Sequence, residues 1–248
     1  MPTALKLVTY NIHKCKGIDG RVSASRIVRV LEEIDADVIA LQEVHNYKSA
    51  EDERQQADFI AKALGMRCIS GPNIVNDTYE YGNIVLTRLP IVLHHNHNIS
   101  VGRREPRGCL QVDIQLGNSL IHIFNAHFGT AYRERVRQAH TLFEAKILAG
   151  LAGSRILLGD FNDWFPGQAS RLLSRRLQDA SYGVLRGWRK RTHPCLLPLF
   201  KLDRIFYEPS LQLRHSYVHR SRLARIASDH LPLVAQLELP TASLGSQT

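Results

Sequence analysis

The sequence predicts an α/β fold in which β-sheets pack face to face and helices cover their outer faces. Two observations point to it. Short runs of apolar and β-branched residues, typical of strands, recur along the whole chain, and three segments with helical spacing of apolar residues stand among them. With 248 residues, 44% of them apolar, the chain can bury a sizeable core. We expect a single domain over residues 1–239 and a polar, disordered tail over residues 240–248.

The first part of the chain alternates between strands and helices. Ser23 can cap a helix whose apolar residues, between Ile27 and Ile34, recur at spacings of three and four. Gly65 can adopt the left-handed conformation that ends a second helix. The predicted elements are a strand over Leu5–Tyr10, a helix from Ser23 to Ile34, a strand over Asp37–Leu41 and a helix over Glu51–Leu64.

The rest of the chain is richer in strands. Gly117 and Asn118 form a turn signal between two of them. One further helix is predicted over Glu134–Leu151. Its apolar face comprises Val136, Ala139, Phe143 and Ile147. The predicted strands are Tyr81–Thr87, Ile91–Ile99, Leu110–Leu116, Leu120–Asn125, Ile156–Leu158, Leu202–Tyr207, Leu211–Val218 and Leu233–Leu239.

The charge balance and the cysteines indicate the kind of partner and compartment. A formal net charge of +9 favours polyanions, such as nucleic acid, an anionic membrane surface or phosphorylated small molecules. The alternative is that arginine and lysine only solvate the surface. The four cysteines are far apart and form no C-x-x-C pair, which argues against a zinc knuckle and favours free thiols, with two long-range disulfides as the alternative.

Two kinds of apolar targeting segment are not expected. The first residues, MPTALKLVTYNIHK, reach a polar residue too early for a signal peptide, and no run of about 18 apolar residues predicts a transmembrane helix. Together with the free thiols, this favours a cytoplasmic protein. We also expect a monomer.

Chemically capable polar residues flank six of the predicted strands. Strand ends are held by a rigid sheet, which suits site residues. In the stretch RILLGDFND, a buried strand reaches Gly159, which we expect to let the chain turn before Asp160 and Asn162. Alone, each polar residue could be an Asx-turn, a cap or a solvated side chain. The set consists of Asn11, His13, Gln42, Glu43, Asn125, His127, Asp160, Asn162, Asp163, Asp203, Ser228, Asp229 and His230.

The residue types in this set predict one chemistry. Carboxylates and carboxamides supply hard oxygen ligands, which suit Mg²⁺ or Mn²⁺, and the absence of cysteine argues against zinc. Histidines can stabilise a phosphate oxyanion or move protons near neutral pH. In phosphoester hydrolysis a metal polarises the phosphoryl oxygen, a carboxylate readies water and cations hold the developing charge. The set therefore predicts a metal-dependent phosphoester hydrolase.

Seven ordered segments give the chain a family resemblance. They are TYNIH, ALQEV, GNIVLTRLPI, NAHFG, GDFND, LDRIF and SDHLPL, and they run from Thr9 to Leu233. GDFN and SDH are weak signals singly, but the ordered set resembles the endonuclease/exonuclease/phosphatase superfamily. That resemblance implies the DNase I-like fold, a four-layer α/β/β/α sandwich.

The resemblance also implies a metal site. Glu43 would be the principal ligand of Mg²⁺ or Mn²⁺, with Asn11 beside it. Asp229 would lie near the metal, with a ligand role at a second metal as one possibility. One metal or two, and which group is the base, stay open.

On the phosphate side, the resemblance implies five roles. Asp160 would orient or deprotonate the attacking water, and Asn162 would hold that water or a phosphate oxygen. His127 occupies a position that touches the phosphate in many members. His230 would contact the scissile phosphate, oriented by Asp203, because a carboxylate fixes an imidazole and raises its pKa.

The functional roles of several other residues keep alternatives. His13 stands where the abasic-site endonuclease branch often has Asp or Asn, which weakens an abasic-site interpretation; we group it with Arg107 as a contact to substrate phosphate. For Arg107 a solvated loop position is the alternative. Trp164 and Phe165 could stack on a base, but packing is the simpler interpretation. The stretch HPCLLPLF is expected to pack in the core and position Asp203, with a substrate-facing or membrane-touching loop as the alternative.

Three functions remain open. The first is a nuclease acting on DNA, favoured by the positive charge because phosphate neutralisation releases counterions. The second is a phosphatase or phosphodiesterase acting on a phospholipid headgroup or soluble phosphoester. The third, a binding protein without activity, is disfavoured by the complete residue set.

Overall fold

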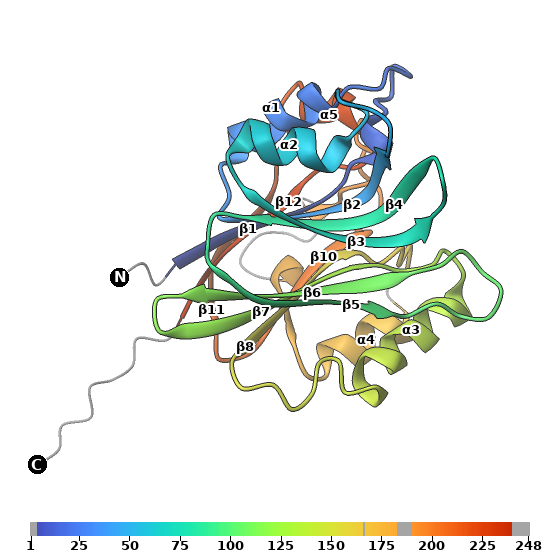
Figure 1. The fold of residues 1–248 in the computed structure, drawn as a ribbon. Coiled ribbons are helices and arrows are strands. Elements are labelled where there is room, and N and C mark those ends of the chain that lie inside the picture. The colour runs from blue at the N-terminus through green and yellow to red at the C-terminus, as the bar shows by residue number, and fades with distance from the viewer. Residues whose placement is uncertain (1–3, 166, 183–189, 240–248) are drawn as a thin grey trace, which may run out of the picture.

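The computed structural model describes residues 4–165, 167–182 and 190–239, and these form two six-stranded sheets stacked on each other (Figure 1). The strands of the first sheet, in spatial order, are β11 (Gln212–Val218), β12 (Leu233–Glu238), β1 (Ala4–Asn11), β2 (Val38–Tyr47), β4 (Tyr79–Thr87) and β3 (Arg67–Val75). Those of the second are β5 (Ile91–Asn98), β6 (Gly108–Leu116), β7 (Ser119–His127), β8 (Ser154–Asp160), β10 (Asp203–Tyr207) and β9 (Gln178–Asp179).

Helices cover the outer face of each sheet (Figure 1). The first sheet carries α1 (Ala24–Ile34), α2 (Gln56–Leu64) and α5 (Ala224–Ala227), and the second carries α3 (Tyr132–Glu144) and α4 (Gln168–Ser174). Two short 3₁₀ helices span His13–Cys15 and Ala180–Tyr182. The four layers confirm the predicted α/β/β/α sandwich.

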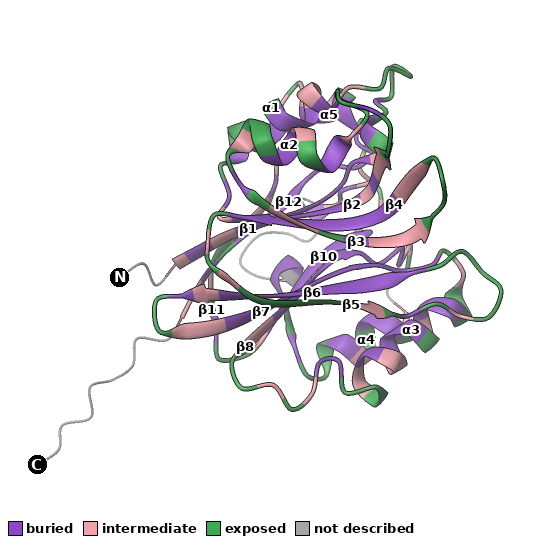
Figure 2. Ribbon diagram, in the orientation of Figure 1, coloured by how far each residue is buried: buried purple, intermediate pink, exposed green. Residues whose placement is uncertain are grey.

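Apolar side chains fill the space between the sheets, where the inner strands are buried along most of their length (Figure 2). One cluster joins the inner faces of both sheets and reaches the underside of α1 and α2. A second cluster lies between the second sheet and α3, where Phe124 and Leu157 pack near Ala139 and Leu142. Burial of apolar area on this scale is the main stabilising contribution to the fold.

Strand direction places the candidate site. β1 pairs in parallel with β2, and β7 pairs in parallel with β8, so the carboxyl ends of each pair meet at one edge. β10 runs antiparallel to β8, with Asp203 directly opposite Asp160. The same register puts His127 opposite Asp160 from the other side. Three predicted site residues thus occupy one row across three strands.

A buried amide pair connects the two sheets just behind this edge. The Gln42 side chain donates to Asn125 Oδ1 at 2.8 Å, and Asn125 Nδ2 donates to the carbonyls of Leu41 and Ile84 at 2.9 and 2.8 Å. Both amides are fully buried, so their hydrogen bonds matter for stability. We refer to Gln42 and Asn125 as the amide clamp.

Helix boundaries differ in part from the predictions. Ser23 accepts the Arg26 N–H and Gly65 ends α2, as predicted. α2 begins at Gln56 rather than at residue 51, because Asp52 accepts the Arg54 N–H in a competing local turn. α3 ends at Glu144, since the chain turns left-handed at Lys146 (φ 56°). Of the predicted apolar face, Ala139 and Phe143 pack in the core cluster, as does Ile147 beyond the end of the helix, whereas Val136 is only half-buried.

One long strand, β3, and one loop differ from what the sequence predicts. β3 contains Gly71-Pro72, which resembles a turn, but β3 is an edge strand, and its pairing shifts next to Pro72, two features that let a strand hold proline. β9, α4 and α5 were also missed, since each is shorter than a clear periodic signal. The prediction that HPCLLPLF packs in the core is wrong for its leucines, which are exposed at positions 196, 197 and 199.

The predicted disordered tail, residues 240–248, lies outside the described residues. All four cysteines are free thiols. Within the part of the chain that the structure describes, no helix has the length and apolar character needed to cross a membrane.

Candidate active site

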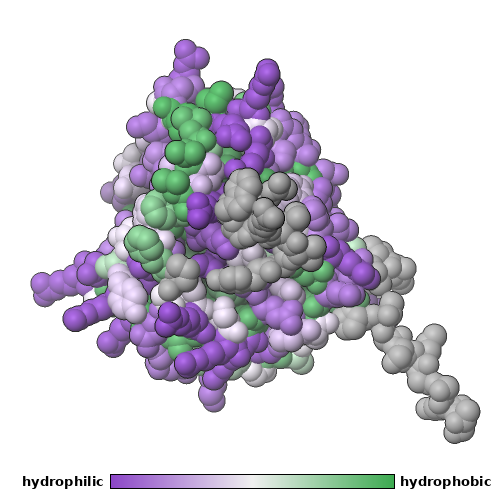
Figure 3. All heavy atoms as spheres, turned by 180° about the vertical axis from the view of Figure 1, so that it is seen from behind, coloured by the Kyte–Doolittle hydropathy of each residue, from purple (hydrophilic) through white to green (hydrophobic). Residues whose placement is uncertain are grey.

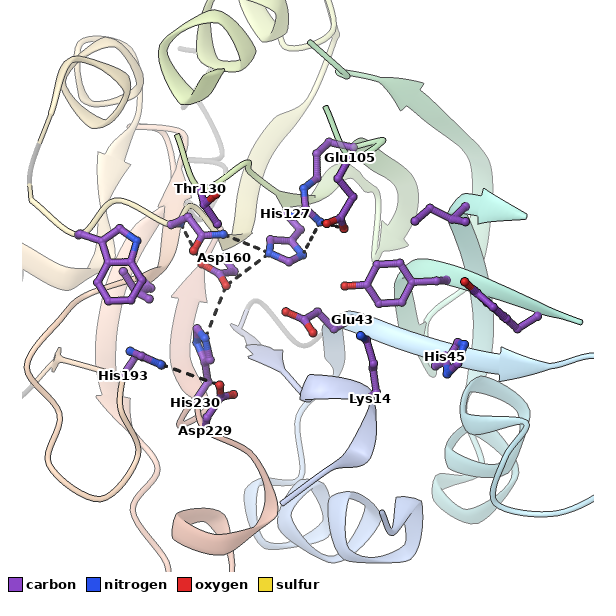
Figure 4. A pocket seen from close by; sticks show the side chains of 17 residues that line it. Lys14, Glu43, His45, Glu105, His127, Thr130, Asp160, His193, Asp229 and His230 are labelled. Atoms are coloured by element: carbon purple, nitrogen blue, oxygen red, sulfur yellow. Dashed lines mark hydrogen bonds and ion pairs between the residues drawn. The ribbon is translucent and has the colours of Figure 1, made fainter. Parts of the chain in front are cut away.

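A cavity of about 620 Å³ opens where the ends of the two sheets meet (Figure 4). Seven of the ten predicted site residues line it, and the other three, Asn11, His13 and Asp203, contact that lining. The predicted residues in the lining are Glu43, Arg107, His127, Asp160, Asn162, Asp229 and His230.

Asp160 lies at the centre of the site and is almost fully buried. Its Oδ1 accepts the Asn162 N–H at 2.9 Å. Its Oδ2 accepts from Asn11 Nδ2 at 3.0 Å and lies 3.6 Å from His127 Nε2 and 3.7 Å from His230 Nε2. One carboxylate oxygen therefore faces an amide donor and two imidazoles.

Gly159 is required for the position of Asp160. It lies inside β8 with φ +148°, and a Cβ there would stand 1.8 Å from the carbonyl oxygen of Ala126 on β7. The expected turn at Gly159 is therefore wrong: the strand continues to Asp160, and glycine serves the close approach of two strands.

Glu43 reaches the cavity from a bulge in β2. The pairing of β2 with β4 shifts between Leu41 and Val44, and Glu43 has a left-handed backbone with φ 58°. A bulge of this kind redirects a side chain from the regular alternation of the strand. Glu43 Oε1 accepts from Asn11 Nδ2 at 3.0 Å, the same nitrogen that contacts Asp160.

The orientation of Asn11 is set by its backbone neighbour. Asn11 Oδ1 accepts the His13 N–H at 3.0 Å, so its amide nitrogen faces the carboxylates of Glu43 and Asp160. In this orientation Asn11 holds the two carboxylates together. Its part as a metal ligand stays a prediction.

His230 is paired with two carboxylates. Its Nδ1 lies 2.8 Å from Asp203 Oδ2, and its Nε2 points to Asp160 (Figure 4). Burial alone would lower the pKa of His230, but Asp203 and Asp160 outweigh burial and raise the pKa to about 10. His230 is therefore a cation at neutral pH.

His127 has the opposite environment. Burial, together with the cations of Arg107 and His230, outweighs Asp160 and lowers the pKa of His127 to about 3. Arg107 Nη1 lies 3.4 Å from His127 Nδ1, and Asn162 Nδ2 lies 3.2 Å from His127 Nε2. Both neighbours only donate, so the neutral ring, with its one acceptor nitrogen, can accept from one of them. Arg107 is itself nearly buried and pairs with Glu105 at 2.9 Å.

Asn162 is also held in an unusual conformation. Its φ is 49°, a left-handed value that asparagine tolerates better than most residues. Asn162 Nδ2 donates to the carbonyl of Phe128 at 2.9 Å and lies 3.2 Å from His127 Nε2. The side chain therefore stands beside the neutral histidine, at the wall of the cavity.

Asp229 lies at the opposite wall. Its two oxygens lie 3.7 Å from His13 Nδ1 and 3.9 Å from His193 Nε2. His13 thus reaches the site through Asp229, and its contact with substrate phosphate stays a prediction.

The donor set fits a divalent cation. Glu43 and Asp160 are two carboxylates brought together on one amide nitrogen, and adjacent negative charges repel unless a cation lies near them. Oxygen ligands of this kind suit Mg²⁺ or Mn²⁺. Among the described residues, two groups of ligand-type side chains share His230, one with His193 and Asp229 and one with Asp160 and Asp203. The protonated His230 ring offers no lone pair to a metal, so the carboxylates are the ligands of choice here.

One wall of the cavity is formed by residues that were not predicted from the sequence. On β2 and β4, His45 packs against Tyr79 at 4.3 Å between ring centroids, and Lys14 Nζ lies 5.4 Å from the Tyr81 ring. His45 and Tyr81 are directly paired across the strands, so the alternation in HNY and YEY could have indicated a shared face. His193 was missed as well, since a lone histidine in a loop gives no signal.

A four-layer sandwich with carboxylates, amides and histidines at the ends of its sheets is the arrangement of DNase I-like phosphoesterases. Residues 8–230 match the model of the Endonuclease/Exonuclease/phosphatase family, and the chain belongs to this family. The family resemblance inferred from the sequence is thus confirmed. Its members are phosphoesterases that generally depend on a divalent metal.

Three similar proteins illustrate the range of the family. The chain is 30% identical to the uncharacterized protein YbhP of Escherichia coli (strain K12), over 95% of this chain and 97% of that protein. It resembles a mannosyl-6-phosphatase of Bacteroides thetaiotaomicron (TM-score 0.75, 23% identity, 94% and 99% of the two chains). It also resembles a humanized TDP2 of D. rerio (TM-score 0.74, 16% identity, 96% and 100%). At these identities the two solved structures show a common fold.

Proposed function

We propose that this protein is a Mg²⁺- or Mn²⁺-dependent phosphoester hydrolase whose active site is the cavity around Asp160. The observation that carries the proposal is the position of the Asp160 carboxylate, which is joined to Glu43 through Asn11 and faces two histidines of opposite protonation state. Membership of a phosphoesterase family supports the same chemistry.

Glu43 is the proposed principal metal ligand, with Asp229 and Asn11 near the metal. When bound, a divalent cation would neutralise charge on the phosphoryl oxygens and make phosphorus more electrophilic. The bulge that turns Glu43 into the cavity and the amide that links it to Asp160 support this assignment.

The other residues act on water and phosphate. Asp160 is the proposed group that orients water and accepts its proton, and Asn162 holds that water or a phosphate oxygen. The His230 cation, oriented by Asp203, donates to a phosphate oxygen and stabilises its developing charge. His127 contributes a neutral imidazole beside Asp160, and Arg107 contributes a buried positive charge.

DNA is the first proposed substrate. The net charge of +9 supports it, as do the exposed Arg103 and Arg104 in the loop that leads to Arg107. The second candidate is a phosphoester of a phospholipid headgroup or a small molecule. Exposed leucines close to the cavity favour this second candidate. Assays with single-stranded DNA, intact and abasic duplexes, RNA, a lipid phosphodiester and inositol phosphates would separate these substrates.

The metal requirement is tested first. We expect EDTA to abolish hydrolysis of bis-(p-nitrophenyl) phosphate and of the preferred substrate, and Mg²⁺ or Mn²⁺ to restore it. Glu43→Gln should lower turnover at least ~10²-fold, the scale of an essential electrostatic group. Glu144→Gln, at an exposed position on α3, is the matched control and should leave turnover unchanged. Full activity after metal removal would contradict the proposal.

A further inference from the structure

Large apolar side chains are exposed along one side of the cavity mouth. Phe165 is 76% exposed, Leu196 61% and Leu197 68%. Scattered exposed apolar residues are normal, but a contiguous group marks an interaction surface. We define the apolar rim as Ile18, Phe165, Leu196, Leu197, Leu199 and Ile226, all of which are exposed.

The rim is contiguous because three chain segments are bonded side by side. The Ile18 N–H donates to the carbonyl of Ile226 at 3.1 Å, which joins the 16–22 loop to α5. Arg225 Nη1 donates to the carbonyl of Leu196 at 3.4 Å, which joins α5 to the 193–200 loop. Figure 3 shows apolar surface gathered in a band on one side of this face of the molecule.

The far end of the rim is fixed by aromatic packing. Phe200, at the end of the 193–200 loop, contacts Trp164 and Phe165 at 4.9 and 6.2 Å between ring centroids. Inside the loop, both the Leu199 and the Phe200 N–H groups donate to the carbonyl of His193 at 2.8 Å. The leucines are therefore presented outward by an internally bonded turn.

The rim and the cavity share chain segments. Trp164 and His193 both line the cavity. Trp164 directly precedes Phe165, and His193 begins the loop that carries the exposed leucines. The Cys195 N–H donates to the carbonyl of Asp229, another cavity residue, at 2.8 Å. A molecule bound at the rim therefore lies close to the cavity in which phosphoester hydrolysis is proposed.

Basic side chains accompany the apolar ones. Lys16 and Arg21 in the first loop and Arg222 before α5 are exposed, while the acidic Asp19 pairs with Arg26 at 2.9 Å. Exposed leucine and phenylalanine beside lysine and arginine is the composition that binds the interface of anionic lipids. The overall charge of +9 has the same sign.

We propose that the apolar rim docks on an anionic phospholipid bilayer, with its leucines and Phe165 entering the interfacial region and the basic residues contacting the headgroups. Docking in this way brings the cavity to phosphates at the membrane surface. That second step rests on the proposed phosphoester hydrolysis, and it makes a headgroup phosphoester the substrate class that this surface favours.

The experiment measures vesicle binding by the full chain. We expect co-sedimentation with vesicles of phosphatidylcholine and phosphatidylglycerol, weaker binding to phosphatidylcholine alone, and release as NaCl rises. Leu196→Ser/Leu197→Ser should weaken vesicle binding at least ~10-fold, since two apolar anchors are lost. Val92→Ser/Leu93→Ser on β5, which removes two equally exposed apolar side chains away from the rim, is the control and should bind like wild type.

Hydrolysis of soluble bis-(p-nitrophenyl) phosphate keeps the two proposals distinguishable. We expect both double variants to retain this activity. Wild-type protein that hydrolyses the soluble ester but ignores vesicles would overturn docking alone, and vesicle binding without any hydrolysis would overturn the proposed function alone. Equal loss of vesicle binding in both double variants would also overturn docking. Two other partners of the rim would also contradict membrane docking. If wild type does not bind vesicles but binds duplex DNA, and only the rim variant loses that binding, the partner is DNA. If wild type does not bind vesicles but dimerises, and only the rim variant loses dimerisation, the partner is a second copy of the chain.

Discussion

The two buried histidines of the cavity face the same oxygen of Asp160 from nearly equal distances, 3.6 Å for His127 and 3.7 Å for His230, yet their pKa values lie on opposite sides of neutrality. Both are buried, and Asp160 raises the pKa of both. The difference comes from the second neighbour. His127 has Arg107, whereas His230 has Asp203.

This comparison shows how one fold obtains two functions from one residue type. Burial makes an imidazole neutral unless a nearby carboxylate compensates. Strand β10, which pairs with β8, supplies such a carboxylate, Asp203, to His230 but not to His127. His230 is therefore suited to bind phosphate charge, and His127 to offer a polar ring without adding charge.

The largest expected effect is at the residue that both histidines share. Asp160→Asn removes the carboxylate between them, and we expect turnover to fall at least ~10²-fold, as for other essential acid–base groups. His230→Ala should cause a loss of similar size because the phosphate-binding cation disappears. Turnover with saturating Mg²⁺ measures both effects, and near-native rates in both variants would refute the assigned site.

A smaller effect should follow at Asp203, the neighbour that distinguishes the two histidines. Asp203→Asn removes the charge that raises the pKa of His230, so we expect at least ~10-fold lower turnover at pH 8 and an alkaline limb shifted to lower pH. The measurement is a profile of kcat/KM from pH 5.5 to 9.5.

Asp113→Asn provides a matched control for that change. Asp113 and His122 form another buried pair, at 2.8 Å, outside the cavity lining. The control should leave the profile unchanged. An unshifted profile in the Asp203 variant would show that His230 does not depend on its carboxylate.

The smallest expected effects concern stability. Between pH 6.5 and 10 folded His230 keeps a proton that the unfolded chain loses, so the free energy of unfolding should fall as pH rises, by up to about 1.4 kcal/mol per pH unit. For His127 the sign is reversed: between pH 3 and 6.5 the unfolded chain gains the proton, so stability should fall as pH decreases.

Urea unfolding in EDTA at pH 5, 6.5 and 8 tests this contrast. His230→Asn should flatten the alkaline slope, and His127→Asn should flatten the acidic one. If His230→Asn flattened the acidic slope and His127→Asn the alkaline one, His127 would be the cation and His230 the neutral ring, contrary to the assignment.

Much of this site could be predicted from the sequence, because its main residues directly follow or precede strands. Asp160, Asn162 and Asp203 are examples, since the local chain fixes where a strand ends. The opposite pKa values of the two histidines could not be predicted. They depend on Arg107 and Asp203, which are distant in sequence and meet only through the pairing of the strands.

The errors have physical causes as well. Gly159 resembled a turn residue, but glycine is required there because a Cβ would collide with the Ala126 carbonyl on another strand. The leucines of the 193–200 loop resembled core residues because hydropathy does not show which way a loop faces. Likewise, Gly71-Pro72 made β3 look like a turn in the sequence, because proline inside a strand is tolerated mainly at the edge of a sheet.

The amide clamp has a consequence for protein engineering. The bulge that redirects Glu43 interrupts the β2–β4 ladder after the pair Leu41 and Ile84, and Asn125 of the other sheet donates to both of their carbonyls. A designer who regularised β2 to improve the sheet would therefore displace Glu43 and leave Asn125 without its acceptors. Substitutions at these positions should therefore affect stability and catalysis together, since the irregular strand and the amide that completes it can change only together.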